Sequence, residues 1–280
     1  MSMPSTNSAS AASAQLPPPP KARPWSKSRI LGHVLMALWI VAGGYLVYYL
    51  SINIASPFFQ KYWPEYVDGF LVTIQIVGWS LLIGAGLSIP IAIARSSRNP
   101  ILNGLSYAYV YFFRGTPLLA QTFLIYYGAG SFRDALTDIG LWWFFRDAIY
   151  CVIFAFSLNT SAYQAEILRG AIENVPKGQW EGGRALGLSR PVIFFRIILP
   201  QALMVALRPY GNEIILMIKG SAIAAIVTIY DIMGETRRAY SRSYDFQAYI
   251  WAAVLYLFLV ETLRRIWDRL EARLTRHLKR

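Results

Sequence analysis

Apolar residues occur in six long runs along the chain, separated by shorter polar and charged segments. The runs cover about residues 31–54, 67–94, 105–128, 148–167, 197–218 and 248–263. Each is close to the ~20 apolar residues that a helix needs to cross the hydrocarbon core of a bilayer. Because helices satisfy their backbone hydrogen bonds internally, the pattern predicts an all-α membrane protein, a polytopic helical bundle.

Composition supports a membrane protein rather than a soluble enzyme. Of the 280 residues, 55% are hydrophobic and only 15% are charged, whereas an average soluble domain is about a quarter charged. The net charge is +12, which alone would also suit a nucleic-acid-binding protein. The basic residues lie between apolar runs, however, so the positive-inside rule explains them better and no nucleic-acid partner is expected.

Counting Lys and Arg in the segments between the runs predicts the orientation of the chain. If the N-terminus is cytoplasmic, the inside segments hold 18 of these residues and the outside segments hold seven. This bias predicts six spans with both termini in the cytoplasm.

The two ends of the chain differ in composition from the apolar middle. Residues 1–29 are rich in Ser, Ala and Pro and carry four basic residues within positions 21–29, which predicts a disordered cytoplasmic tail before an uncleaved helix at 30–55. Residues 266–280 form a basic tail whose apolar positions follow helical spacing, which predicts an amphipathic helix lying on the inner leaflet. Those apolar positions begin in the last span and are Leu263, Trp267, Leu270, Leu274 and Leu278.

Metal and disulfide chemistry find little support in the chain. Cys151 is the single cysteine and lies in an apolar run, and the two histidines, His33 and His277, are at opposite ends. No metal site is therefore expected. Asp68, at the start of the second run, is interpreted as a helix cap.

The longest internal polar segment, about residues 169–200, predicts a helix–turn–helix elbow on the cytoplasmic side. A short helix is expected from Lys177 to Leu186, ending at Gly187 as its C-terminal cap. Pro191 would then open the next helix. Such an elbow suits insertion into a groove of a partner protein, although a solvated loop is the other interpretation.

The same segment resembles the EAA loop of binding-protein-dependent ABC importers. That pattern is Glu-Ala-Ala, three residues, Gly, nine residues, then Ile-x-Leu-Pro. The matching positions here are Glu181, Gly187, Ile197, Leu199 and Pro200. Gly182 and Gly183 replace the usual alanines, which would make the docking helix less rigid.

The resemblance covers roughly residues 60–275 and points to the polar amino acid permeases, near the histidine/lysine-arginine-ornithine and opine importers. Further matching motifs are Asp68-Gly69-Phe70, Phe113-Arg114-Gly115-Thr116-Pro117-Leu118, Leu158-Asn159-Thr160-Ser161-Ala162-Tyr163 and Asn212-Glu213-Ile214-Ile215-Leu216-Met217. The resemblance implies a five-helix permease core, about 60–265, to which the first helix is an addition.

What the resemblance implies about assembly is specific. The chain would be an inner-membrane permease subunit that pairs with a second, often non-identical, permease. Two ATP-binding subunits would dock on the elbow and bind ATP and Mg²⁺, while this chain binds no cofactor and is not itself an enzyme. A periplasmic binding protein would deliver the substrate. The residues expected to couple to the ATPase are Glu181, Gly182, Gly183, Arg184, Ala185 and Gly187.

Glu213 is the expected substrate contact. An ionised group in a membrane span costs ~2.5 kcal/mol or more, so Glu213 should face the bundle interior or water. The resemblance implies a site for the cationic group of a basic amino acid or an opine, and the alternative is a structural ion pair with Arg208 or Arg114. Further expected pathway residues are Asn212, Tyr163, Thr160, Thr116 and Gln121, and Arg114, Pro117, Leu199 and Pro200 are expected to be structural.

Two other functions compete with an importer subunit. A self-sufficient proton-coupled carrier would use Glu213 as its proton site, but such carriers usually show two related halves, and none are apparent here. An intramembrane enzyme would need a clustered nucleophile and base, which the sequence does not offer.

Overall fold

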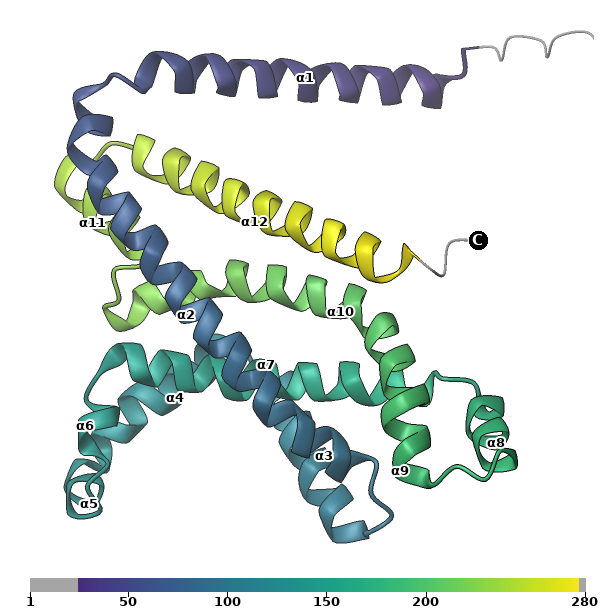
Figure 1. Cartoon of the computed structure of the whole chain (residues 1–280). Coiled ribbons are helices and arrows are strands. Elements are labelled where there is room, and N and C mark those ends of the chain that lie inside the picture. The colour runs from purple at the N-terminus through teal and green to yellow at the C-terminus, as the bar shows by residue number, and fades with distance from the viewer. Residues whose placement is uncertain (1–24, 277–280) are drawn as a thin grey trace, which may run out of the picture. The chain divides into compact units, whose positions relative to one another are not determined.

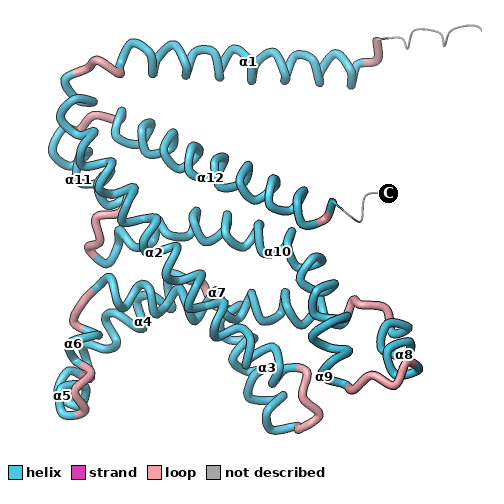
Figure 2. Tube along the Cα trace, viewed as in Figure 1, coloured by secondary structure: helices cyan, strands magenta, loops and turns pink. Residues whose placement is uncertain are grey.

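The computed structural model describes residues 25–276, and all the regular structure within that range is helical (Figure 2). Contacts divide the chain into two compact units that meet between Ser56 and Pro57. The first unit contains α1 (Lys27–Asn53), and the second contains the remaining helices.

Helix α1 begins earlier than the sequence pattern indicates. Ser26 is its N-cap, and the Ser26 hydroxyl accepts a hydrogen bond from the Arg29 amide at 3.3 Å. Lys27 and Arg29 therefore belong to the helix, so the prediction of a tail through residue 29 is wrong at its end. Residues 1–24, which hold most of the predicted tail, lie outside the described residues.

Helix α2 (Pro57–Arg95) is 39 residues long and includes the second predicted span. At 1.5 Å per residue it measures about 58 Å, about twice the thickness of a bilayer core. Asp68 lies well inside this helix, so its interpretation as a helix cap is wrong.

Helix α7 (Ala148–Glu173) occupies the centre of the second unit and contacts α2, α3 (Pro100–Gly115), α4 (Leu118–Ser131) and α10 (Leu199–Gly220) (Figure 1). A small residue allows the tightest of these contacts. A Cβ atom on Gly84 of α2 would overlap the Thr160 methyl group of α7. Small residues let membrane helices approach closely, so α2 and α7 pack backbone to backbone at this point.

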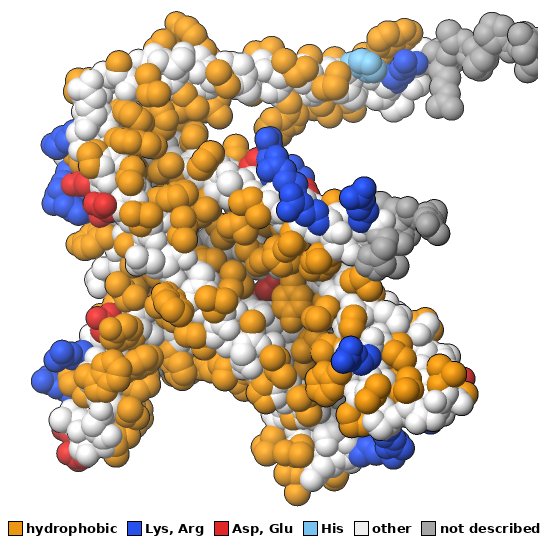
Figure 3. All heavy atoms as spheres, in the orientation of Figure 1, with side chains coloured by type: hydrophobic (Ala, Val, Ile, Leu, Met, Phe, Trp, Pro, Cys, Tyr) orange, Lys and Arg blue, Asp and Glu red, His pale blue; other side chains and the backbone are white. Residues whose placement is uncertain are grey.

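Three helical stretches of the described residues are long and apolar enough to cross a membrane: Lys27–Asn53, Pro57–Arg95 and Arg190–Val227. The other three predicted spans coincide with α3–α4, α7 and α12 (Gln247–Leu274). Helix α7 is less apolar because its buried face carries polar side chains that bond to neighbouring helices. Hydrophobic side chains cover much of the visible face of the molecule (Figure 3).

Two segments between the long helices are also helical. The short helices α5 (Arg133–Asp138) and α6 (Trp142–Phe145) connect α4 to α7. After α10, a 3-10 segment, η2 (Ser221–Val227), leads to α11 (Ile232–Ser243). The Asp231 side chain caps α11, accepting a 2.8 Å hydrogen bond from the Gly234 amide.

The predicted C-terminal tail is not a separate surface helix. Helix α12 continues without interruption from the sixth predicted span to Leu274. Trp267, assigned from its spacing to a lipid-facing stripe, instead packs against Gly211 of α10 and donates a 2.8 Å hydrogen bond from Nε1 to the Leu207 carbonyl. The prediction that this face lies on the inner leaflet is therefore wrong at Trp267, and Leu278 lies outside the described residues.

Candidate functional site: a buried carboxylate and a helical elbow

Glu213 lies inside the bundle, on the face of α10 that meets α7. Only 6% of the residue is exposed. The hydroxyl of the fully buried Thr160 donates a 2.8 Å hydrogen bond to Glu213 Oε1. Gln164, one turn further along α7, donates from Nε2 to Thr160 Oγ1 at 3.1 Å and to the Leu81 carbonyl at 3.3 Å. A chain of polar groups thus connects α2, α7 and the Glu213 carboxylate.

Neither cation considered as a structural partner forms an ion pair with Glu213. Arg208 binds Glu271 of α12 instead, with 2.7 Å between Arg208 Nε and Glu271 Oε1. The Arg114 guanidinium lies over the Tyr163 ring, 5.1 Å from its centroid. The alternative of a pair with Arg208 is therefore wrong. No described lysine or arginine lies within ion-pair distance of the Glu213 carboxylate.

The predicted interruption of the third span is a break between α3 and α4 at Thr116 and Pro117. Gln121 holds this break closed. Its Nε2 lies 2.7 Å from Thr116 Oγ1, 3.1 Å from the Thr116 carbonyl and 2.9 Å from the Phe113 carbonyl. Asn159 of α7 donates to the same Phe113 carbonyl at 2.9 Å and to Gln121 Oε1 at 3.0 Å. The amide of Gln121 is therefore used to satisfy backbone groups that Pro117 leaves unpaired.

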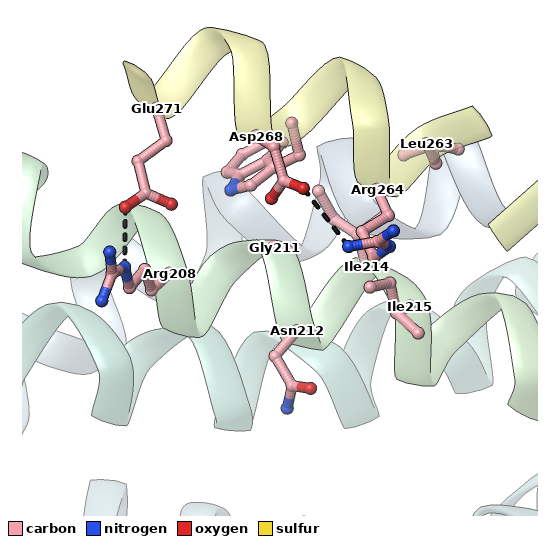
Figure 4. Close-up of a pocket in the computed structure, with 10 residues that line it drawn as sticks. Arg208, Gly211, Asn212, Ile214, Ile215, Leu263, Arg264, Asp268 and Glu271 are labelled. Atoms are coloured by element: carbon pink, nitrogen blue, oxygen red, sulfur yellow. Dashed lines mark hydrogen bonds and ion pairs between the residues drawn. The ribbon is translucent and has the colours of Figure 1, made fainter. Parts of the chain in front are cut away.

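The two remaining predicted pathway residues, Tyr163 of α7 and Asn212 of α10, have different surroundings. Tyr163 is half-buried, and its hydroxyl donates a 3.4 Å hydrogen bond to the Arg114 carbonyl. Asn212 is exposed and lines a cavity of about 360 Å³ between α10 and α12 (Figure 4). Glu213 is buried and does not line this cavity. The Arg208–Glu271 and Arg264–Asp268 ion pairs border that cavity. The structure thus brings Glu213 and Thr160 together, and it places Asn212 apart from them.

The predicted elbow is present and its cap is well defined. Helix α8 (Lys177–Ala185) ends at Leu186, and Gly187 follows with φ +75°. The Gly187 amide donates to the Arg184 carbonyl at 2.9 Å, and the Leu188 amide donates to the Gly183 carbonyl at 3.1 Å. This pair of bonds is a Schellman motif, which requires a left-handed residue and therefore favours glycine at position 187.

The two glycines that replace the usual alanines have different surroundings. A Cβ atom on Gly183 would lie 2.8 Å from Ile193 Cγ1 and 3.0 Å from its Cδ1, whereas Gly182 has no such neighbour within 4 Å. Ile193, in α9 (Arg190–Ile193), is fully buried. Gly183 is therefore required for close packing between α8 and α9, which the sequence did not indicate. Glu181, Arg184 and Ala185 are exposed.

A π-helical turn, η1 (Phe194–Ile198), joins the elbow to α10. Pro200, the second residue of α10, has no N–H and its ring conflicts with the carbonyl four residues earlier. The helix widens at this point, and the Leu199 amide bonds to the Phe194 carbonyl, five residues back. Gln201 stabilises the turn because its Nε2 donates to the Ile197 carbonyl at 2.9 Å and to Gln179 of α8 at 3.4 Å.

Several residues of these two sites were not singled out from the sequence. Gln164 could have been found, because it lies four residues after Thr160 and so on the same face of a helix. The contacts of Asn159, Gln201 and Glu271 join residues 22 to 63 positions apart, and no local pattern identifies them.

Comparison with known proteins identifies the family. Residues 84–277 match the sequence profile of the family described as "Binding-protein-dependent transport system inner membrane component". The chain belongs to this family. The permease is 41% identical over 217 residues to the nopaline transport system permease protein NocM of Agrobacterium fabrum, an alignment that covers 77% of this chain and 90% of NocM. It is 37% identical over 227 residues to the histidine/lysine/arginine/ornithine transport system permease protein HisM of Salmonella typhimurium, covering 78% and 97% of the two chains.

A solved structure shows the same fold. The permease resembles a chain of an amino acid ABC transporter crystallised with histidines, with a TM-score of 0.67 and 31% sequence identity. The match covers 76% of this chain and 95% of that chain. The predicted all-α permease fold and the resemblance to ABC importer permeases are confirmed.

Proposed function

We propose that this permease is the membrane subunit of an ATP-driven, binding-protein-dependent importer of a basic amino acid or an opine. The family match and the relatives support transport of this class of substrate. The observation that carries the choice of a cationic substrate is Glu213, a carboxylate buried in the bundle with no ion-pair partner among the described residues.

Glu213 would bind the ammonium or guanidinium group of the substrate as it passes between α7 and α10. A buried carboxylate without an ion-pair partner is costly, and a cation that binds it directly offsets that cost. HisM is named for histidine, lysine, arginine and ornithine, whose side chains all carry a positive charge when protonated. Thr160 would orient the carboxylate, since its hydroxyl already holds one of the two oxygens. Tyr163, Thr116 and Gln121 would line the pathway further along α7 and at the α3–α4 break, and Asn212 would contribute from a different face of α10.

The ATP-binding subunits would dock on the elbow. Those subunits, and not this chain, would bind ATP and Mg²⁺. Glu181 and Ala185 lie four residues apart on one exposed face of α8 and Gly182 lies beside them, while Gly183 packs inward against Ile193. The complete importer would contain two such ATPases, a second permease that is homologous to this one, and a periplasmic binding protein. In the inner membrane the chain would cross six times, with both termini in the cytoplasm.

One purification tests the importer assembly. A C-terminal tag is used to extract the complex gently from native membranes, and the co-purifying proteins are identified. We expect an ATPase with a phosphate-binding loop and a second permease. The ATPase should be lost when Glu181 and Gly187 are replaced together. A chain that purifies alone and moves substrate in liposomes without ATP would instead be a secondary carrier.

A separate substitution tests the substrate site. Glu213→Gln preserves shape and the Thr160 hydrogen bond but removes the charge, so we expect uptake of a basic amino acid to fall about tenfold or more, the loss of one charge-assisted contact of at least ~1.5 kcal/mol. Assembly with the ATPase should be unchanged. Glu173→Gln is the control, because it removes an exposed carboxylate on α7 that binds Arg169. Equal uptake by the Glu213 and Glu173 variants would contradict the proposed site.

A further inference from the structure

We propose that a basic groove between the elbow and the turn that connects α2 to α3 binds the phosphate headgroup of an anionic phospholipid. The inference rests on the cytoplasmic orientation of the elbow in the proposed function. It assigns Arg184, which the resemblance places among the ATPase-coupling residues, to a groove on a different face of α8 from Glu181 and Ala185.

The groove is open, has a volume of about 570 Å³ and combines three arginines with aromatic walls. Arg98 comes from the turn between α2 and α3, Arg184 from α8 and Arg190 from α9. The remaining lining residues are Trp180, Pro191, Phe194 and Phe195. Basic side chains are visible at this α8–α9 corner of the molecule (Figure 3).

The charge of the groove is not neutralised by the described part of the chain. No carboxylate lines it. Arg98, Arg184 and Arg190 take part in none of the ion pairs of the described residues, whereas the nearby Arg95 and Arg169 both bind Glu166, at 2.9 and 2.7 Å. Three uncompensated guanidinium groups around one groove favour an anion, and guanidinium binds phosphate through two parallel hydrogen bonds.

The position of the groove along the chain favours a lipid as the source of that phosphate. Arg98 follows the end of the second predicted span by four residues, and Phe194 and Phe195 immediately precede the fifth. Both arms of the groove therefore lie where spans reach the cytoplasmic surface, at the depth of the lipid headgroups. Aromatic side chains are typical of this interface, and clustered Lys and Arg on the cytoplasmic side bind anionic lipids. Phe195 is 63% exposed, so its ring is available to acyl chains.

Lipid and ATPase would use different faces of α8. Trp180 and Arg184 are four residues apart and line the groove on one side of the helix. Glu181 and Ala185, also four residues apart, are exposed on the adjacent side. A bound headgroup would hold the elbow against the membrane surface without covering the proposed docking face.

The test measures lipid selectivity of the complete permease–ATPase complex. The complex is placed in nanodiscs of phosphatidylcholine with a minor fraction of phosphatidylglycerol, and retained phosphatidylglycerol is quantified by native mass spectrometry. In the variant Arg98→Gln/Arg190→Gln, which leaves Arg184 unchanged, we expect affinity for phosphatidylglycerol to fall about 25-fold, or about fivefold for each arginine near the surface. Each single variant should lower the affinity for phosphatidylglycerol about fivefold. The single variants keep the test informative if the double variant assembles poorly.

The matched control is Arg196→Gln/Arg273→Gln, which removes the same charge from exposed residues outside the groove. This control should retain phosphatidylglycerol within twofold of the wild type. The ATPase content of every complex is measured alongside. Equal lipid retention by test and control variants would overturn the inference. The inference would also fail if the Arg98/Arg190 variant lost the ATPase but retained lipid like the wild type, because the groove would then be a protein-binding surface. Loss of the ATPase from the wild type would instead count against the proposed function.

Discussion

The two adjacent glycines of α8 provide a direct test of how the elbow is built. Gly182→Ala and Gly183→Ala add the same methyl group at neighbouring positions of one short helix. At Gly182 the methyl group meets nothing within 4 Å, whereas at Gly183 it would lie 2.8, 3.0 and 3.2 Å from three side-chain carbons of Ile193. All three separations are shorter than an ordinary carbon–carbon contact of about 3.5–4.0 Å.

The difference in stability between the two variants can be worked out because the gain in helix propensity is common to both and cancels. Replacing glycine by alanine inside a helix stabilises the helix by about 1 kcal/mol, mainly through lower backbone entropy in the open state. Only Gly183→Ala also overpacks the contact with α9, which costs about 1–3 kcal/mol. Since Ile193 is fully buried, it has little space to move away. The free energy of opening α8 should therefore differ between the variants by about 1–3 kcal/mol, with Gly183→Ala the less stable.

Amide hydrogen exchange of α8 in the purified complex measures this difference. We expect exchange of the α8 amides to be about 5- to 150-fold faster in Gly183→Ala than in Gly182→Ala, with amides of α7 unchanged. Replacing Ile193 by alanine removes the three opposing carbons, so adding Gly183→Ala to Ile193→Ala should be neutral or stabilising. Equal protection of α8 in the two single variants would refute the packing explanation.

Three further predictions concern other parts of the permease. Burial raises the pKa of Asp231 to about 6, above its value of about 3.9 in the unfolded chain, so the folded state binds the proton more tightly than the unfolded state. The free energy of unfolding in detergent should therefore rise by about 2 kcal/mol as the pH falls from 7 to 4, and Asp231→Asn should lack this increase in thermal unfolding. Gly211→Ala would place a methyl group against the Trp267 ring, so α12 should separate from α10 and the midpoint of thermal unfolding should fall. Gly178→Ala, at an exposed position with no neighbour within 4 Å, is the control and should not lower the midpoint. Gln121→Leu removes the side-chain hydrogen bonds that close the α3–α4 break. Asn159 still donates to the Phe113 carbonyl, but the Thr116 carbonyl loses its bond to Gln121, so the complex should lose about 1–3 kcal/mol of stability in a denaturation series.

Local chemistry explains why parts of the fold were predictable from the sequence. Pro117 cannot donate a backbone hydrogen bond, and the structure interrupts the helix there. Gly187 adopts φ +75° and ends α8, and Pro191 lies in the first turn of the next helix. Each of these outcomes depends on one residue and its immediate neighbours, so the sequence contained the information.

The errors at Trp267 and Arg208 have a different cause, namely contacts with residues far away in the chain. The spacing of apolar residues showed that Trp267 lies on an apolar face, but an apolar face suits a protein neighbour as well as a lipid surface. Gly211, 56 positions earlier, allows Trp267 to contact the protein, because a glycine leaves room for the indole ring. Arg208 was considered as a structural partner of Glu213, yet the four residues between them turn the two side chains to different faces of α10, and Arg208 binds Glu271.

The two candidate sites are joined by one helix, which bears on how the elbow could act on the pathway. Helix α10 runs from the π-helical turn at the elbow to Glu213, 14 residues after Leu199, or about 21 Å of helix. The other side of Glu213 is held by Thr160 and Gln164 on α7, which Gly84 brings against α2. A displacement of α8 would be passed to α9 and α10, because Gly183 packs directly against Ile193. The Thr160–Glu213 hydrogen bond joins α7 to α10, so we expect a movement of α10 relative to α7 to strain this contact.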